Sequence, residues 1–155
     1  MRLHLLTVGQ KMPAWVAAGF RDYCGRMPPE LRLELKEIQS GDRGKGANVD
    51  RAREVEARRL LDAVPRGAGI VALDPAGRQQ STEQLSRRMA QWLQDGRDIA
   101  LLVGGPDGLA DTCIDAADQR WSLSELTLPH MLVRVVVAEQ LYRAWSILAN
   151  HPYHR

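Results

Sequence analysis

Val103 to Gly108, with the sequence VGGPDG, is the stretch best suited to contact a small molecule. Its three glycines leave backbone N–H and C=O groups uncovered, so a flat ligand such as adenosine can lie close to the main chain. No Gly-Lys-Ser/Thr or GxGxxG pattern follows, so this is neither a phosphate loop nor a dinucleotide fingerprint. A tight turn between a strand and a helix is the simpler interpretation, and these residues alone favour it.

A second candidate stretch is Ser122 to His130, which places three hydroxyl groups among leucines just ahead of an expected helix. The hydroxyls of Ser122, Ser124 and Thr127 could cap that helix. Alternatively, the stretch could wrap a mostly apolar cofactor while its backbone satisfies polar edges of the ligand. The spacing of the residues does not choose between the two.

The third candidate is the end of the chain, His151 to Arg155, which combines an aromatic ring, two imidazoles and a guanidinium. Tyr153 could stack on an RNA base, Arg155 could hold a phosphate, and His154 could relay a proton. We therefore predict catalytic or substrate-positioning roles for these three residues. A frayed terminus is the alternative. His130 and His151 flank the last expected helix and could also approach a site.

Other kinds of active site are not indicated. The order of residues contains no Ser-His-Asp or Cys-His arrangement, zincin motif or paired carboxylates, and we expect no metal. Asp74, Asp107 and Glu139 are interpreted as turn or packing residues. Cys24 and Cys113 are expected to be reduced, buried thiols of a cytoplasmic protein.

The expected elements alternate between strands and helices along the chain. This alternation predicts one α/β domain over residues 1–155, with a mainly parallel sheet and helices on both faces. Ligands of such sheets bind at the carboxyl ends of the strands, which selects residues 73–77, 104–108 and 123–128. The expected strands are 2–8, 31–38 (at an edge), 70–73, 99–103 and a short piece near 121; the expected helices are 13–27, 49–64, 82–95, 109–119 and 129–148.

The last expected helix is apolar around most of its circumference between Met131 and Leu148. A surface helix needs only one apolar stripe, so this helix is expected to be covered on two sides. We predict a homodimer that buries this helix, which contains Val136, Leu141 and Trp145.

Charge and hydropathy restrict the partners only loosely. A net charge of +2 permits nucleic-acid binding without demonstrating it, and Arg43 and Lys45 in the glycine-rich loop are expected to be solvated. No apolar run approaches the roughly 20 residues that cross a bilayer, so no membrane partner is expected. Leu3 to Val8 is too short for a signal peptide, and a cytoplasmic location is expected.

Four motifs in order, VGGPDG, WSLSELTLPH, VAEQLYRAWSI and NHPYHR, resemble the RlmH family of ribosomal RNA pseudouridine N3-methyltransferases in the SPOUT superfamily. The resemblance covers the whole chain, including LTVGQKMPAWV at its start and the loop SGDRGKGANV. It implies an α/β fold with a C-terminal trefoil knot, S-adenosylmethionine held in the knotted loops, and a homodimer. The implied substrate is a pseudouridine in helix 69 of 23S rRNA, recognised on the assembled 70S ribosome.

Carried onto this chain, the resemblance implies a set of cofactor-binding residues in the three loops that the strand ends already select. To these we add Gly105 from the glycine loop. The set is Leu73, Gly104, Gly105, Leu123, Ser124, Glu125, Leu126, Thr127 and Leu128. The carboxylate of Glu125 is expected to face solvent and to carry little chemistry.

Two other functions remain open from the sequence. A flavodoxin-like nucleotide-binding protein would share the alternation of strands and helices and the glycine loops, but would not explain the tail. A catalytically silent ribosome-binding module could keep a cofactor pocket without turnover.

Overall fold

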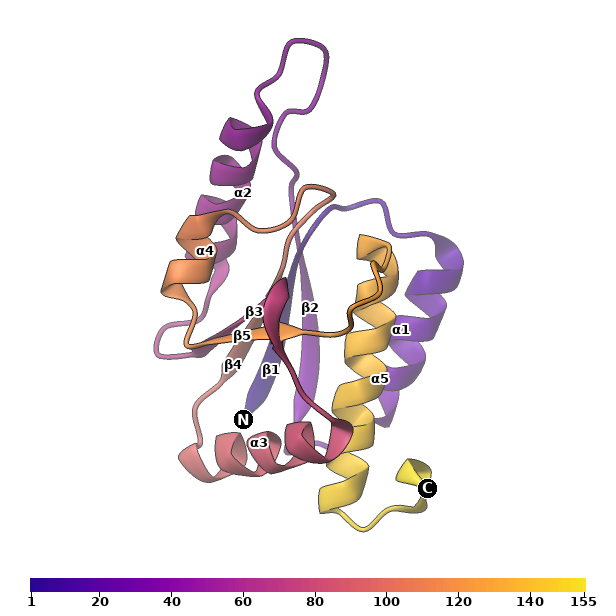
Figure 1. Cartoon of the computed structure of the whole chain (residues 1–155). Coiled ribbons are helices and arrows are strands. Elements are labelled where there is room, and N and C mark those ends of the chain that lie inside the picture. The colour runs from indigo at the N-terminus through magenta and orange to yellow at the C-terminus, as the bar shows by residue number, and fades with distance from the viewer.

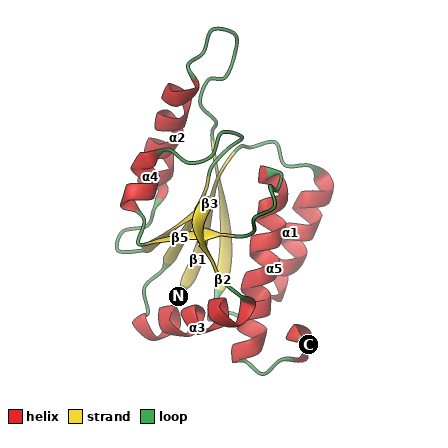
Figure 2. Cartoon of the chain, viewed as in Figure 1, coloured by secondary structure: helices red, strands yellow, loops and turns green.

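Five strands form one parallel sheet in the order β2-β1-β4-β3-β5 (Figures 1 and 2). The structure is a computed structural model that describes residues 1–155. The strands are β1 Arg2–Val8, β2 Arg32–Ile38, β3 Gly69–Gln79, β4 Ile99–Val103 and β5 Gln119–Ser122. The prediction of a parallel sheet is therefore confirmed, and β2 lies at an edge as its alternating pattern indicated.

Helices cover both faces of this sheet, as predicted. Figure 1 shows α2 and α4 on one side and α1 and α5 on the other. Side chains of β1 point to the two faces of the sheet and contact helices on both. Leu3 and Leu5 pack with α1, α3 and α5, whereas Leu6 and Val8 pack with α2 and α4. The helices are α1 Ala14–Arg26, α2 Val49–Ala63, α3 Thr82–Asp95, α4 Asp111–Ala116 and α5 His130–Leu148, followed by a single 3₁₀ turn, η1 Pro152–His154.

Local polar residues start two of the helices. Ser81 and Gln84 form the capping box that the sequence indicated: the Gln84 amide donates to Ser81 Oγ at 3.1 Å, and the Ser81 amide donates to Gln84 Oε1 at 2.8 Å. Asn48 caps α2 by accepting from the Arg51 amide at 3.1 Å. These caps fix where each helix leaves its preceding loop.

β3 is longer than its hydrophobic run, because it continues through residues that we expected to form a loop. Leu73 and Arg78 both oppose Trp121 of β5, so the residues between them bulge out of the ladder. Within the bulge, Asp74 accepts from the amide of Ala76 at 3.1 Å. The hydrophobic run that predicted the strand ends before Asp74, whereas backbone pairing with β5 resumes at Arg78, beyond the bulge.

α4 is shorter than expected because Asp118 is committed to the sheet. Its carboxylate accepts from the Ile70 amide at 2.8 Å, which draws the chain into β5 two residues earlier than predicted. A helix continuing to Gln119 would lose this contact.

α5 packs between α1 and α3, and its own chain covers part of the surface that we assigned to a dimer. Leu141 is fully buried in the core of its own chain, so this part of the helix needs no partner to cover it. Val136 and Trp145 remain partly exposed. α5 also carries Arg134, which is 0% exposed and interrupts its apolar surface.

The helices contain no segment that is both long enough and apolar enough to cross a membrane. No group of three or more His, Cys, Asp or Glu side chains is arranged to hold a metal ion.

Candidate cofactor and substrate site

A cavity of about 490 Å³ lies where the neighbouring strands β4, β3 and β5 end. All nine residues predicted to bind a cofactor line it, and they come from three loops that are distant in the sequence. The volume falls within the range of small-molecule sites, about 300–1,000 Å³. Outside the three stretches that the sequence selected, the wall contains only Trp121 and Val133.

The glycine loop forms a closed turn at the edge of this cavity. The Gly108 amide donates to the Gly105 carbonyl at 3.0 Å, and Gly108 has a φ of +76° that favours glycine. A Cβ at Gly104 would lie 2.4 Å from the Gly108 carbonyl carbon, so no side chain fits there. The backbone is therefore bare because the turn requires it.

A side chain at Gly105 would point toward β1 and Arg43. A Cβ there would lie 3.1 Å from Val8 Cγ1 and 3.6 Å from a guanidinium nitrogen of Arg43. A larger residue would thus first press on β1 and on Arg43. Substitution of Gly105 is thus expected to affect a bound ligand by displacing the glycine loop.

The hydroxyl groups of residues 122–127 stabilise the loop itself and do not cap α5. Ser122 Oγ donates to the Ser124 carbonyl at 3.2 Å, and the Leu126 amide donates to Ser124 Oγ at 2.9 Å. Pro129 precedes α5 and no side chain caps it. Glu125 is exposed, as expected, and Leu126 is 76% exposed at the rim of the cavity.

An ion-pair bridge connects the loop after β2 to the glycine loop. Arg43 donates from Nε to Asp107 Oδ2 at 2.7 Å and pairs through two nitrogens with the buried carboxylate of Glu56. These contacts raise the pKa of Arg43 above its ordinary value. Arg43 is therefore a structural bridge and not the solvated charge that the sequence suggested.

His130 lines the cavity as the first residue of α5. Burial lowers the pKa of its imidazole below the ordinary 6.5, and repulsion by Arg134 and Arg43 adds to this effect. The ring is consequently neutral at pH 7 and can accept a proton or a hydrogen bond.

Arg134, one turn further along α5, fixes the start of the helix against β1 and β2. Its guanidinium donates to the Gly9 carbonyl at 2.7 Å and pairs with Glu37 Oε2, also at 2.7 Å. The only local sign of Arg134 is a charged residue within the apolar first half of α5, and its partners lie far away in the sequence.

The predicted catalytic tail is ordered and packs on the last turns of α5. The Tyr153 ring packs against Tyr142 with centroids 4.6 Å apart and the ring planes tilted by 42°, and its hydroxyl donates to Glu139 at 3.1 Å. Burial and these hydrogen bonds raise the pKa of Tyr153 well above 10. The alternative of a frayed terminus is therefore wrong for Tyr153, whereas Arg155 is exposed and His154 is partly exposed.

The tail does not meet the cavity of its own chain. His130 at the cavity and the tail stand at opposite ends of α5, whose 19 residues span about 28 Å at 1.5 Å per residue. Figure 1 shows the C-terminus at the far end of α5 from the loops that line the cavity. One chain therefore brings the predicted cofactor residues together but leaves His154, Tyr153 and Arg155 elsewhere.

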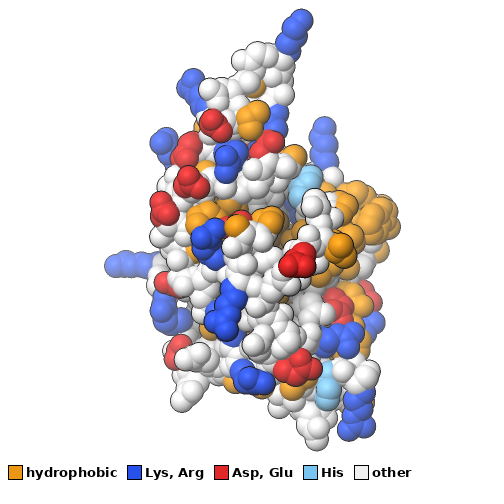
Figure 3. Space-filling view, in the orientation of Figure 1, with side chains coloured by type: hydrophobic (Ala, Val, Ile, Leu, Met, Phe, Trp, Pro, Cys, Tyr) orange, Lys and Arg blue, Asp and Glu red, His pale blue; other side chains and the backbone are white.

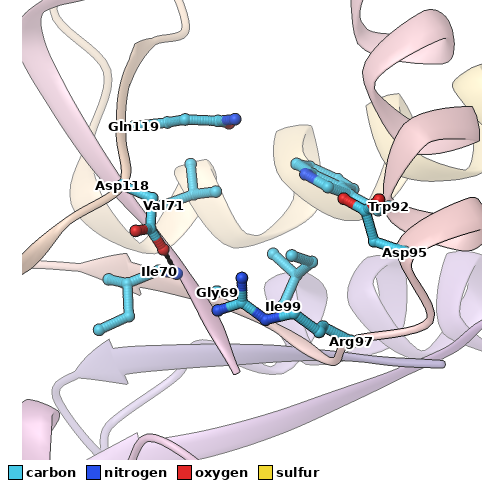
Figure 4. A pocket seen from close by; sticks show the side chains of 9 residues that line it. All are labelled: Gly69, Ile70, Val71, Trp92, Asp95, Arg97, Ile99, Asp118 and Gln119. Atoms are coloured by element: carbon cyan, nitrogen blue, oxygen red, sulfur yellow. Dashed lines mark hydrogen bonds between the residues drawn. The ribbon is translucent and has the colours of Figure 1, made fainter. Parts of the chain in front are cut away.

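A smaller cavity of about 220 Å³ lies at the opposite, amino-terminal edge of the sheet (Figure 4). Trp92 and Arg97 line it together with Asp118, whose carboxylate is bound to the Ile70 amide. None of the predicted site residues lies there.

Solved structures of other proteins share this fold. A Neisseria gonorrhoeae protein assigned to a methylase family matches with a TM-score of 0.56 at 15% identity, covering 90% of this chain and 81% of that one. A structure described by its role in 2-OH methylation of C/U34 on tRNA matches with a TM-score of 0.52 at 19% identity, covering 96% and 97%. At these identities the likeness establishes the fold alone.

The family follows from the sequence match. The family of predicted SPOUT methyltransferases matches residues 1–154, and the chain therefore belongs to the SPOUT methyltransferase family. The chain is also 56% identical over 155 residues to a Thioalkalivibrio sulfidiphilus protein named ribosomal RNA large subunit methyltransferase H, covering 100% of this chain and 99% of that protein. The resemblance drawn from the four motifs is confirmed, and family membership implies the C-terminal trefoil knot.

Proposed function

We propose that this protein transfers a methyl group from S-adenosylmethionine to N3 of a pseudouridine in helix 69 of 23S rRNA, acting on the assembled 70S ribosome. The main observation is that one cavity gathers nine residues from three separate loops. The name of the Thioalkalivibrio sulfidiphilus relative supports ribosomal RNA of the large subunit as the substrate.

The residues of the cavity fit S-adenosylmethionine. The turn requires glycine at position 104, and the uncovered backbone that results allows a flat adenine to approach closely. Leu73, Leu123 and Leu128 supply apolar walls, while the backbone of residues 123–128 supplies polar groups. When bound, S-adenosylmethionine provides an electrophilic methyl group on its sulfonium.

The chain's own chemistry is then to position the base and to receive its N3 proton. His130 is the imidazole that lines the cavity, and its lowered pKa keeps it neutral and able to accept a proton at pH 7. The buried Arg134 beneath it holds the start of α5 in place. In-line placement of the base nitrogen is expected to supply much of the rate enhancement.

A homodimer would bring the tail to a cavity. A two-fold axis across α5 sets the two helices antiparallel, which moves the tail of one protomer toward the start of the other's α5. Hydrophobic side chains gather over the starts of α1 and α5 (Figure 3), and this region includes Trp15, which is 65% exposed. We therefore assign His154 and Arg155 to the partner's substrate site, with Tyr153 anchoring the tail.

Transfer of a radiolabelled methyl group to 70S ribosomes lacking the modification tests the activity. We expect the label in 23S rRNA, and nuclease digestion should yield it as a pseudouridine of helix 69 that is methylated at N3. Label at another position would overturn the assignment of the substrate, and binding of the ribosome without transfer would establish the silent module. Calorimetric titration with S-adenosylmethionine, FMN and NAD tests the flavodoxin-like alternative, which preference for FMN would support.

Mixing two inactive variants tests the composite site. Gly104→Ala impairs the cavity, and the double change His154→Asn with Arg155→Gln impairs the tail. If the tail acts on the partner, each mixed dimer holds one complete site out of its two. Random association makes about half of the dimers mixed, so about a quarter of the activity returns. If the tail acts within its own chain, the mixture stays inactive.

A further inference from the structure

A groove between the end of β3 and α3 is lined only by arginine and glutamine side chains. It encloses about 230 Å³, and no carboxylate and no apolar residue borders it. Its lining consists of Arg78, Gln80, Gln84, Arg87, Arg88 and Gln91. We refer to it as the arginine groove.

One side of the arginine groove is formed by residues of α3 that share a face of the helix. Gln84, Arg88 and Gln91 recur every three to four residues and so occupy one face of the helix. The adjoining face, about 100° round the helix, is buried through Leu85 and Met89, which leaves the polar face toward solvent. Figure 3 shows Lys and Arg side chains over the end of β3 and over α3 on the face toward the viewer.

The three guanidinium groups have no anionic partner within the chain. None of Arg78, Arg87 and Arg88 forms a salt bridge, whereas Arg120 nearby is paired with Asp74. Burial lowers the pKa of Arg88, and repulsion by Arg78 adds to this effect, as expected for two cations that line one groove without an anion. The Gln84 carbonyl oxygen is used in the capping box, so its amide nitrogen keeps donors for a ligand.

The arginine groove adjoins the wall of the large cavity. Arg78 pairs in the sheet with Trp121, and Trp121 also lines that cavity. Gly77 permits this close approach, because a Cβ there would lie 2.8 Å from the backbone carbon of Arg120. A chain of nucleotides with one base in the large cavity could therefore continue along the arginine groove.

We propose that the arginine groove binds the phosphate backbone of single-stranded or looped RNA next to the nucleotide held in the large cavity. Guanidinium and amide donors match phosphate oxygens, and the absence of apolar lining leaves no platform for a base. The inference rests on the proposed RNA substrate but names a contact surface outside the methyl-transfer cavity.

The test compares two triple variants with equal charge change. Arg78→Gln, Arg87→Gln and Arg88→Gln remove the cations of the groove. The control changes Arg32, Arg58 and Arg66 to glutamine in the same way. These three side chains are exposed and form no ion pair, and they lie on β2, on α2 and in the loop after α2.

Binding of a fluorescein-labelled single-stranded RNA is measured by anisotropy over a series of KCl concentrations. Loss of three phosphate contacts should reduce the slope of log affinity against log salt by about 2, which is about 100-fold in affinity at ~0.1 M KCl if both proteins bind equally at ~1 M. The control triple should keep the slope of the unaltered protein. S-adenosylmethionine affinity and the melting temperature should not change in either variant.

Methyl transfer to 70S ribosomes separates this inference from the proposed function. We expect the groove triple to raise KM for ribosomes with little change in kcat. An unchanged salt slope, or equal losses in the two triples, would overturn the arginine groove even if the unaltered enzyme methylates rRNA. If the slope falls as expected while no rRNA is methylated, the groove stands and the proposed function fails.

Discussion

Gly104→Ala is the smallest change that should disable the cavity. The added Cβ would lie 2.4 Å from the Gly108 carbonyl carbon and 2.6 Å from its oxygen. Non-bonded carbon atoms prefer about 3.5–4.0 Å, so the glycine turn must open by roughly 1 Å. Both contacts are backbone atoms and cannot rotate away.

The size of the effect follows from this displacement. Overpacking of this kind costs about 1–3 kcal/mol, and each kcal/mol lowers the melting temperature of a domain of this size by about 2–4 °C. We therefore expect a loss of about 2–12 °C. A ligand that needs the closed turn must overcome the same strain, so the dissociation constant of S-adenosylmethionine should rise at least ~10-fold, which corresponds to 1.4 kcal/mol.

Calorimetric titration with S-adenosylmethionine, together with thermal unfolding, measures both quantities. Gly25→Ala in α1 is the matched control, because no atom lies within 4 Å of its added Cβ. It should bind normally and gain up to about 1 kcal/mol in stability. A folded Gly104→Ala protein with the affinity of the unaltered chain would refute the role assigned to the glycine turn.

Three further outcomes are expected. His130→Asn should reduce kcat for methyl transfer and remove the acid limb of the pH profile. Because the pKa of His130 is lowered, that limb should lie below pH 6.5 in the unaltered enzyme. An acid limb that persists in the variant would exclude His130 as the proton acceptor. Arg134→Met should lower the free energy of unfolding by about 3 kcal/mol, since it leaves the Gly9 carbonyl and Glu37 without their donor, and denaturant titration showing less than about 1 kcal/mol would contradict this. Trp15→Glu should convert the proposed dimer to a folded monomer in sedimentation, and an unchanged dimer would place the interface elsewhere.

Local patterns predicted the parts of the fold that depend on near neighbours. The alternation of β2 follows from one buried face, and the capping box at Ser81 follows from hydrogen bonds between residues three apart. The glycine and Ser122–His130 stretches could be placed at one edge because parallel strands end together. The knot was implied by the resemblance alone, since no periodicity distinguishes a threaded chain from an ordinary doubly wound sheet.

Contacts between distant residues set the features that the sequence did not predict. The bulge in β3 depends on the fit of Gly77 against Arg120, and the burial of Leu141 depends on how α5 settles between α1 and α3. The position of the tail was missed for the same reason, because the length of α5 separates it from the cavity only once the direction of that helix is known.

Near each of the three loops of the cavity, an arginine joins parts of the chain that are distant in the sequence. Arg43 holds the glycine loop through Asp107, Arg120 holds the bulge of β3 through a 2.6 Å ion pair, and Arg134 holds the start of α5 through a backbone carbonyl. Loops without regular hydrogen bonding would otherwise lose conformational freedom when a ligand binds. Ordering them during folding removes that loss from the binding step, so charge at these positions acts on affinity without touching the ligand.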